Sequence, residues 1–445
     1  MNVAVMKTKA EQAIAENFEA VAEKLPGSAA VKARRSQAIG AFSGLGLPHR
    51  RVEEWKYTDL RVNVKDVLPS AINDATPLTI AELLVALGPL AHVDAHRVVF
   101  VNGHYRADLG DFSDAVGAMV APLGELLSGA SEDVIAPMIS TPEGGDAVET
   151  LNTAFMTDGA VVTIEGGASL AKPLLLVFVR AGTQAQSVAV RNFVTVGEKA
   201  AVEIIEAHVV LPGASHDAQL NALTEVAVGK GATLRHAKVA ADEGKALHLS
   251  NWDVTLAADA TYRSFQFSAG LGLARNNQNI IFEGEGAKID LSGAYLARHA
   301  EHIDTTLVVD HAVPRCESRE LFKGVLDGRG CGVFQGKIIV RPDAQKTDGK
   351  QMSQALMLSE DAEFDSKPEL EIYADDVVCG HGTTSAQLDP DLLFYCRSRG
   401  IPENEARALM IESFIGEAID KVENEQLRDA LTAYTMLWLG RSPRG

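Results

Sequence analysis

Between residues 160 and 368 the chain alternates apolar and polar residues almost without interruption, in short segments separated by Gly and Asp turns. Segments such as LLLVFVR and NFVTVGEKAAVEIIE place every second side chain on one face, which is the pattern of β-strands. Helical spacing is almost absent from this region. About 200 residues of strand must bury their apolar faces against one another, and this requirement limits the fold more than any other feature.

A loose repeat underlies these strands. A small residue recurs, usually after Gly or Asp, and an apolar residue follows two positions later. The small residues are Ala168, Ala200, Ala232, Ala260, Ala287, Cys331 and Ala362, and the apolar ones are Leu170, Val202, Leu234, Tyr262, Ile289, Val333 and Phe364. By subtraction the steps are 32, 32, 28, 27, 44 and 31 residues. A period of roughly 30 in an all-strand region is typical of a solenoid, whose coils bury their inward residues by stacking on their neighbours.

We therefore predict a mainly β protein with a parallel β-helix. The small residue marks a corner where coils stack closely, and the apolar residue is the first inward side chain after it. Leu234 and Ile289 should then lie in one stacked core. A β-sandwich with similar turns is the alternative, because the spacing is irregular.

Helical patterns flank the strand region on both sides. We expect helices over residues 10–25, 29–42 and 80–87 near the start of the chain. Near its end, Pro402 begins an amphipathic stretch to 422, and residues 424–439 supply a second one. A helical unit at the end of a solenoid caps it or presents a binding face.

These patterns divide the chain into three predicted regions. Residues 1–97 form an N-terminal helical and mixed region, residues 98–388 the β-helix core, and residues 389–445 a C-terminal helical domain. The C-terminal helices have apolar faces larger than a simple cap requires, so we expect them to bind a partner.

Composition excludes several classes of protein. There are 41 Lys and Arg against 60 Asp and Glu, a net charge of −19, and no basic run for a phosphate backbone. The start lacks the apolar core of a signal peptide, and the longest apolar run, Leu174–Val179, is far shorter than the roughly 20 residues that span a bilayer. The four cysteines show no CxxC spacing, which fits free thiols in a reducing cytosol. We expect a soluble cytoplasmic protein without nucleic-acid or membrane partners.

Motifs of common enzymes are missing from the sequence. It contains no G-x-x-x-x-G-K-[ST], G-x-S-x-G or H-E-x-x-H, so no ATP is expected to bind this chain through a phosphate loop. A β-helix enzyme acting on polysaccharides is an alternative, although aromatic residues for stacking sugars make up only 6% of the chain.

Longer motifs resemble one known family. They are GVFQGKI at 332–338, DAQKTDGKQ at 343–351, KPELEIYADDVVCGHGTT at 367–384 and LFYCRSRGI at 393–401, with weaker matches in EEWKYTDL and LNTAFMTDGA. The chain resembles the SufB/SufD scaffold family of the SUF iron–sulfur cluster assembly system, its D-type members more than its B-type ones. The resemblance covers roughly the whole chain. The sequence departs from the family pattern at Val378 and Gly380, where Lys and Ser are common, and at Cys396, where Leu is usual.

The resemblance implies a fold, partners and no catalytic activity. The fold is a right-handed parallel β-helix flanked by N-terminal and C-terminal α-helical regions. The β-helix pairs with a homologous protein of the SufB type, and the C-terminal helices bind the SUF ATPase, a protein of the SufC type. Alone, the chain can form a homodimer instead. A B-type member that carries the cluster itself is the alternative within the family.

Cys379 and His381 are the candidate cofactor-binding residues, and His381 is the candidate metal ligand. Residues two apart on a strand point the same way, so both share one face. Thiolate and imidazole suit iron or zinc, but two ligands cannot close a tetrahedral site, so sulfide, water or another protein must supply the rest. The resemblance implies that His381 serves nascent cluster assembly at the interface with the SufB-type partner, through a transient iron–sulfur cluster or iron shared with it. A buried structural thiol explains Cys379 equally well.

Two other polar groups have structural interpretations. Asp375 and Asp376 fit an acidic turn between coils. A second group contains His299, His302, Asp304, Asp310, His311 and Cys316. We expect ladders and turns rather than a metal site there, because an interval of three places His299 and His302 on opposite faces of a strand.

Overall fold

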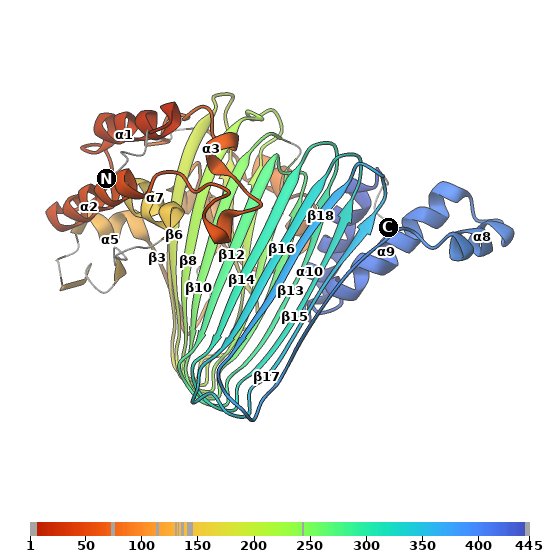
Figure 1. Cartoon of the computed structure of the whole chain (residues 1–445). Coiled ribbons are helices and arrows are strands. Elements are labelled where there is room, and N and C mark those ends of the chain that lie inside the picture. The colour runs from red at the N-terminus through yellow and green to blue at the C-terminus, as the bar shows by residue number, and fades with distance from the viewer. Residues whose placement is uncertain are drawn as a thin grey trace, which may run out of the picture.

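The computed structural model describes residues 7–72, 76–112, 115–129, 131, 133–134, 138–139, 146–242 and 244–440. It shows a mainly β protein built on a parallel β-helix with helices at both ends of the chain, which confirms the predicted fold class (Figure 1).

Strands alternate between two sheets as the chain coils. The ten-stranded sheet contains, in spatial order, β19 (Val378–Ala386), β17 (Asp348–Met357), β15 (Glu317–Leu326), β13 (Lys288–Ala297), β11 (Thr261–Ala269), β9 (Thr233–Ala241), β7 (Ala201–Val210), β5 (Leu174–Arg180), β1 (His96–Val101) and β2 (His104–Tyr105). The nine-stranded sheet contains β18 (Glu363–Ile372), β16 (Cys331–Val340), β14 (His302–His311), β12 (Leu273–Phe282), β10 (Leu247–Leu256), β8 (Ala218–Val228), β6 (Gln186–Val196), β4 (Ala160–Ile164) and β3 (Ala118–Pro122).

The regular coils begin later than residue 98. β1 pairs with β2, and β3 with β4, in antiparallel fashion, whereas the other strand pairs are parallel. Between β3 and β4 the chain also forms α5 (Leu123–Gly129) and α7 (Ala147–Phe155). Strands therefore alternate regularly between the sheets only from about residue 160, where the period-two pattern of the sequence also begins.

The corners that lead into β5, β7, β9, β11, β13, β15 and β17 of the ten-stranded sheet share a two-residue construction, which the corner before β19 lacks. The first residue has a positive φ, and the second is small and, from the second corner onward, buried, because a larger side chain would not fit between stacked coils. The pairs are Gly167-Ala168, Lys199-Ala200, Gly231-Ala232, Asp259-Ala260, Gly286-Ala287, Arg315-Cys316 and Lys346-Thr347.

The predicted repeat is correct up to Ala287 and wrong at its last two members. Cys331 begins β16 and Ala362 precedes β18, and both strands belong to the other sheet. The true members are Cys316 and Thr347, which replace the irregular step of 44 by steps of 29 and 31. Each coil has two corners, and small residues next to apolar ones occur at both, so the linear pattern alone does not distinguish them.

A large apolar cluster fills much of the interior of the solenoid. It includes Leu234 and Ile289 together, as predicted, with residues from both sheets. The parallel register stacks equivalent inward positions directly on one another: Leu234 lies beside Tyr262, and Tyr262 beside Ile289. Each coil therefore buries its inward side chains only with the help of its neighbours.

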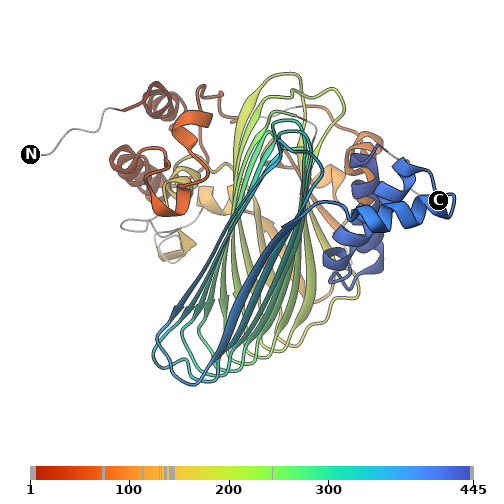
Figure 2. The same cartoon turned by 45° about the vertical axis from the view of Figure 1, so that its right-hand side comes forward.

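Helices cover the outer faces of the two sheets on opposite sides of the solenoid (Figure 2). The outer face of the ten-stranded sheet packs in one apolar cluster with residues from four elements. These elements are α4 (Ile80–Leu87), the 3-10 helix η2 (Gly88–His92), α9 (Glu403–Ile419) and α10 (Glu425–Trp438). Tyr434 of α10 donates its hydroxyl hydrogen to the carbonyl of Leu87 at the end of α4, 2.8 Å away. This bond joins the C-terminal helices to the N-terminal region.

The N-terminal region covers the nine-stranded sheet. It contains α1 (Lys9–Val21), α2 (Ala29–Leu45), the 3-10 helix η1 (Glu53–Trp55) and α3 (Leu60–Asn63), and a further 3-10 helix, η3 (Ala107–Leu109), follows β2. The predicted helices over 10–25, 29–42 and 80–87 are thus present, within a few residues at their ends. Trp55 and Leu60 pack in one cluster with Leu249 of β10 and Leu273 of β12.

The C-terminal end of the solenoid is open. β18 and β19 form the last coil and stand at the edges of their sheets. After them α8 (Pro390–Ser398) projects away from the rest of the molecule and contains no buried residue (Figure 1). Among the described residues, no helix has both the length and the apolar character needed to cross a bilayer.

Candidate functional site

Cys379 and His381 lie on β19, the last strand of the solenoid. Their partners on β17 are Gly349 and Gln351, which are both buried. Cys379 packs against the apolar cluster that contains Ile338, so it faces the interior of the coil. His381, two residues on, occupies the next inward-facing position of the strand.

The open end of the solenoid explains the exposure of both side chains. Cys379 is half-buried and His381 is exposed, although equivalent positions in earlier coils are buried. Thr383, the next inward position, donates a hydrogen bond across the coil to the Ser366 hydroxyl of β18, at 2.9 Å. This hydrogen bond joins the two strands of the last coil at Thr383. In the described part of the chain, no further coil covers His381.

The thiol of Cys379 must lose its proton before it can bind a metal. Burial raises the pKa of this thiol above its usual value, although a backbone hydrogen bond at Gly349 opposes the shift. A metal binds the thiolate, so an incoming cation must displace the proton. His381 needs no such step in its neutral form.

No closed metal centre surrounds these two residues. Among the residues that the structure describes, no three His, Cys, Asp or Glu side chains lie close enough together to hold a metal ion. Cys379 and His381 thus form half a site at most, and further ligands must come from outside the chain.

Asp375 and Asp376 lie in the turn between β18 and β19. The carboxylate of Asp376 pairs with Lys346, and its backbone N–H donates to the side-chain oxygen of Gln345 at 2.9 Å. Lys346 is also the corner residue with positive φ before Thr347. These contacts hold the last two turns together, as expected for an acidic turn.

The second histidine group is dispersed in the structure. His299 lies in a turn with φ of 59°, outside any strand, so the argument from opposite strand faces does not apply to it. His302 is hydrogen-bonded at 2.9 Å to Thr58 of the N-terminal region, and His311 at 3.1 Å to Ser318. These hydrogen bonds are compatible with the predicted structural role, although the reason given for it does not apply to His299.

Asp304 of that group serves the attachment of the N-terminal region. Its carboxylate pairs at 2.7 Å with Arg275, and both side chains are almost fully buried. Arg275 also donates to the carbonyl of Glu54 at 2.7 Å and lies over the ring of Trp55, 3.9 Å from its centroid. Thr58 donates its hydroxyl hydrogen to Asp304.

A buried polar group in the middle of the solenoid was not predicted from the sequence. Glu206 accepts a hydrogen bond from the ring of His236 at 2.8 Å, and Lys238 donates to Asn276 at 2.7 Å. Burial lowers the pKa of Lys238 to about 7. A cavity of about 60 Å³ lies beside His208 and His248. The sequence alone did not show that these polar residues face inward, because this depends on the register of the coils.

A second group that was not predicted lies directly beneath His381. Gln351 is the partner of His381, and Glu320 on β15 is the partner of Gln351. Both are almost fully buried. Burial raises the pKa of Glu320 to about 8, because no cation among the described residues compensates its carboxylate.

This pKa predicts a pH-dependent stability. A carboxyl group titrates near 4.5 when unfolded, so between pH 4.5 and 8 the folded state binds this proton more tightly than the unfolded state. The contribution of Glu320 to the free energy of unfolding should fall as pH rises through this window, by up to about 1.4 kcal/mol per pH unit. In Glu320→Gln the contribution is absent. Denaturant unfolding of both proteins at pH 5, 6, 7 and 8 measures it, and parallel pH profiles would contradict it.

Comparisons with known proteins place most of the chain in one group. Residues 178–414 match the model described as "SUF system FeS cluster assembly, SufBD core domain", and residues 8–176 match "SufBD protein N-terminal region". An iron–sulfur cluster assembly SufBD family protein of Synechocystis is 30% identical over 408 residues, 89% of each chain. The iron–sulfur cluster assembly protein SufD of Escherichia coli is 31% identical over 391 residues, 87% of this chain and 88% of that protein. SufD of Bacillus subtilis is 25% identical over 64% of each chain.

Proposed function

This chain belongs to the SufBD family of SUF-system iron–sulfur cluster assembly proteins and is SufD-like, and on that basis we propose that it is a non-catalytic scaffold protein. It pairs with a homologous SufB-type protein through its β-helix and binds a SUF ATPase through its C-terminal helical region. The nascent iron–sulfur cluster is cargo that these proteins hold between them. The four free cysteines support a reducing compartment, the cytoplasm.

The open last coil carries this proposal. Strands in the middle of each sheet have neighbours on both sides, whereas β18 and β19 each have one free edge. A free strand edge accepts a strand of another chain through backbone hydrogen bonds. Apolar side chains exposed here, among them Val378 and Tyr373, would be buried by such a partner.

A partner at this end would also complete the half-site. A coil stacked on β19 brings its own inward side chains above Cys379 and His381, as each earlier coil does for the one below it. Thiolate and imidazole suit iron, and the partner or free sulfide supplies the missing ligands. Without a SufB-type partner, a second copy of this chain would occupy the same surface.

The experiment is co-expression with the two partner proteins, with and without this chain, followed by anaerobic purification. The proposal expects one complex containing all three proteins, and less iron and acid-labile sulfide on the partners when this chain is omitted. Separate migration of the chain and unchanged iron and sulfide without it would overturn the proposal. Cleavage of glycans by the isolated chain would favour the polysaccharide-active alternative.

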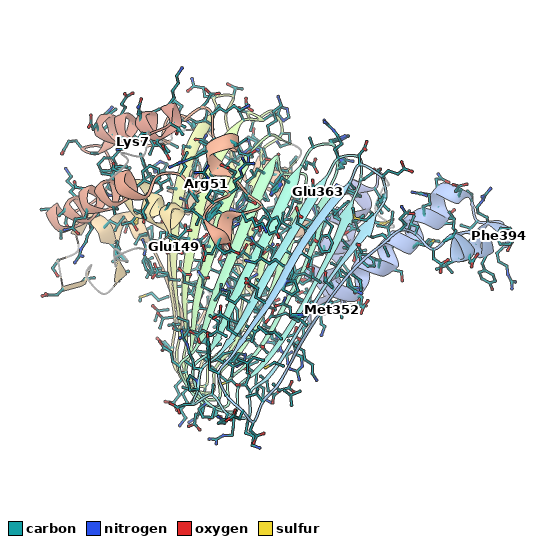
Figure 3. All side chains as sticks on the ribbon, viewed as in Figure 1. Lys7, Arg51, Glu149, Met352, Glu363 and Phe394 are labelled. Atoms are coloured by element: carbon teal, nitrogen blue, oxygen red, sulfur yellow. The ribbon has the colours of Figure 1, made fainter. Side chains whose placement is uncertain are left out.

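The ATPase-binding surface lies on α8 in this proposal. The apolar faces of residues 402–422 and 424–439, which suggested docking, are used inside the molecule: Ile411, Ile415 and Leu431 belong to the cluster that covers the ten-stranded sheet. α8 instead exposes Leu392, Phe394 and Tyr395, with Phe394 72% exposed. Phe394 lies in the middle of α8, in the part of the molecule that projects farthest from the solenoid (Figure 3).

Substitution on α8 tests this assignment. Phe394→Asp should weaken ATPase binding by at least about tenfold, since exposed aromatic residues commonly anchor interfaces. Folding should not change, because α8 buries no side chain. The matched control is Val85→Asp on α4, whose side chain is also exposed, at 63%. Calorimetric titration with the purified ATPase measures binding, and equal affinities of the two variants would place the surface elsewhere.

A further inference from the structure

Glu320, Gln351 and His381 form one inward-facing column. They are consecutive partners in the parallel register of β15, β17 and β19, so their side chains lie on the same face of the sheet at successive coils. Glu320 and Gln351 are 4% and 3% exposed, whereas His381 is exposed at the open end. The column leads from the interior of the solenoid to the half-site.

The two buried members carry three oxygen atoms without hydrogen-bond donors. Within the described part of the chain, neither carboxyl oxygen of Glu320 has a partner, and the side-chain oxygen of Gln351 has none. The amide nitrogen of Gln351 makes a single long hydrogen bond, 3.4 Å, to the carbonyl of Gly336. Buried polar atoms in native proteins are nearly always satisfied, so three buried oxygen atoms without partners in one column require a reason.

Glycine at position 336 leaves room for the amide of Gln351. A Cβ atom at Gly336 would lie 2.3 Å from the side-chain oxygen of Gln351, so no other residue fits there without displacing it. Beneath the column, Leu291 is the partner of Glu320 and is fully buried. The polar column is closed below by this leucine and open above at His381.

The buried oxygen atoms of Glu320 and Gln351 lack donors among the described residues, and the imidazole ring of His381 next to them carries an N–H group. A histidine that binds a metal through one ring nitrogen is commonly held by a hydrogen bond from its other N–H to a carbonyl or carboxylate oxygen. The side-chain oxygen of Gln351 is such an acceptor on the strand next to His381. Gln351 can then turn its NH₂ group toward an oxygen of Glu320.

We propose that Gln351 and Glu320 are positioning residues for the imidazole of His381. The inner ring N–H of His381 donates to the side-chain oxygen of Gln351, and the NH₂ group of Gln351 donates to a carboxyl oxygen of Glu320. The outer ring nitrogen keeps its lone pair directed out of the open coil toward the metal. This inference rests on the proposed role of His381 as a ligand and extends it two coils into the protein.

The ring tautomer of His381 tests the column without any metal. In the full chain labelled with ¹⁵N-histidine, the His381 resonances, assigned by their loss in His381→Ala, should show a single dominant tautomer. Gln351→Met keeps the side-chain volume but removes the acceptor, and should bring the two tautomers toward the ratio of a free imidazole. An unchanged tautomer ratio in Gln351→Met would overturn the proposal.

Stability and cluster assembly together separate positioning from mere packing. Glu320→Leu removes an unpaired buried carboxyl, so it should raise the denaturation midpoint while lowering the iron on the assembled complex at least threefold. Glu320→Gln keeps an acceptor oxygen and should retain assembly. If Glu320→Leu and Gln351→Met assemble normal amounts while His381→Ala does not, the column has no role and the half-site stands. If His381→Ala also assembles normally, the proposed function of the site fails as well.

Discussion

Replacing His381 by alanine lowers the iron and sulfide held by the assembled complex by about tenfold or more, because it removes the exposed imidazole of the half-site. The same change leaves folding nearly untouched, since His381 is exposed on the last strand and substitutions at such positions usually shift stability by less than about 0.5 kcal/mol. Complex formation should also be retained, because in the proposed complex backbone edges rather than this ring join the two proteins. Cys379→Ser should reduce the iron less, since its thiol is half-buried and protonated.

Iron and acid-labile sulfide are counted on complexes purified anaerobically from cells that supply the cluster. His216→Ala is the matched control, because His216 is also exposed but lies in the loop between β7 and β8. Normal iron and sulfide in His381→Ala would make His381 an ordinary strand residue.

Replacing Asp304 by alanine lowers the free energy of unfolding by about 3–5 kcal/mol. The guanidinium of Arg275 would stay buried without its carboxylate, and Thr58 would lose the acceptor of its hydroxyl hydrogen. Both contacts attach the segment around Trp55 to the nine-stranded sheet, so this segment should also become more accessible to protease.

Denaturant unfolding of the native protein and of Asp304→Ala measures the loss. The free energy of unfolding should depend equally steeply on denaturant concentration in both proteins. The control is Glu317→Ala, which breaks the exposed pair between Lys288 and Glu317 on neighbouring strands. Exposed pairs contribute at most about 1 kcal/mol, so this variant should stay close to the native protein. Similar losses in the two variants would show that the buried pair does not anchor the N-terminal region.

Local patterns of the sequence determined the fold class. Period-two alternation and corners such as Asp259-Ala260 predict stacked coils, because they express requirements within a few residues: strand pleat, a positive φ and a small side chain. The helices at both ends follow from helical spacing for the same reason. The pair Cys379 and His381 was also visible, since two residues on one strand share a face whatever surrounds them.

Only the tertiary structure decided which corners stack and what lies beneath the half-site. Cys331 and Cys316 look alike in the sequence, but the register places Cys316 on the corner above Ala287 and Cys331 in the other sheet. Glu320 and Gln351 are 31 residues apart and meet His381 only through stacking. The apolar faces of α9 and α10 predicted a partner, yet the solenoid of this same chain covers them. The sequence by itself thus determined the coils and one pair of candidate ligands. The burial of Glu320 and Gln351, their place beneath His381 and the covered faces of α9 and α10 all depend on contacts between residues far apart in the chain. A linear pattern does not contain such contacts.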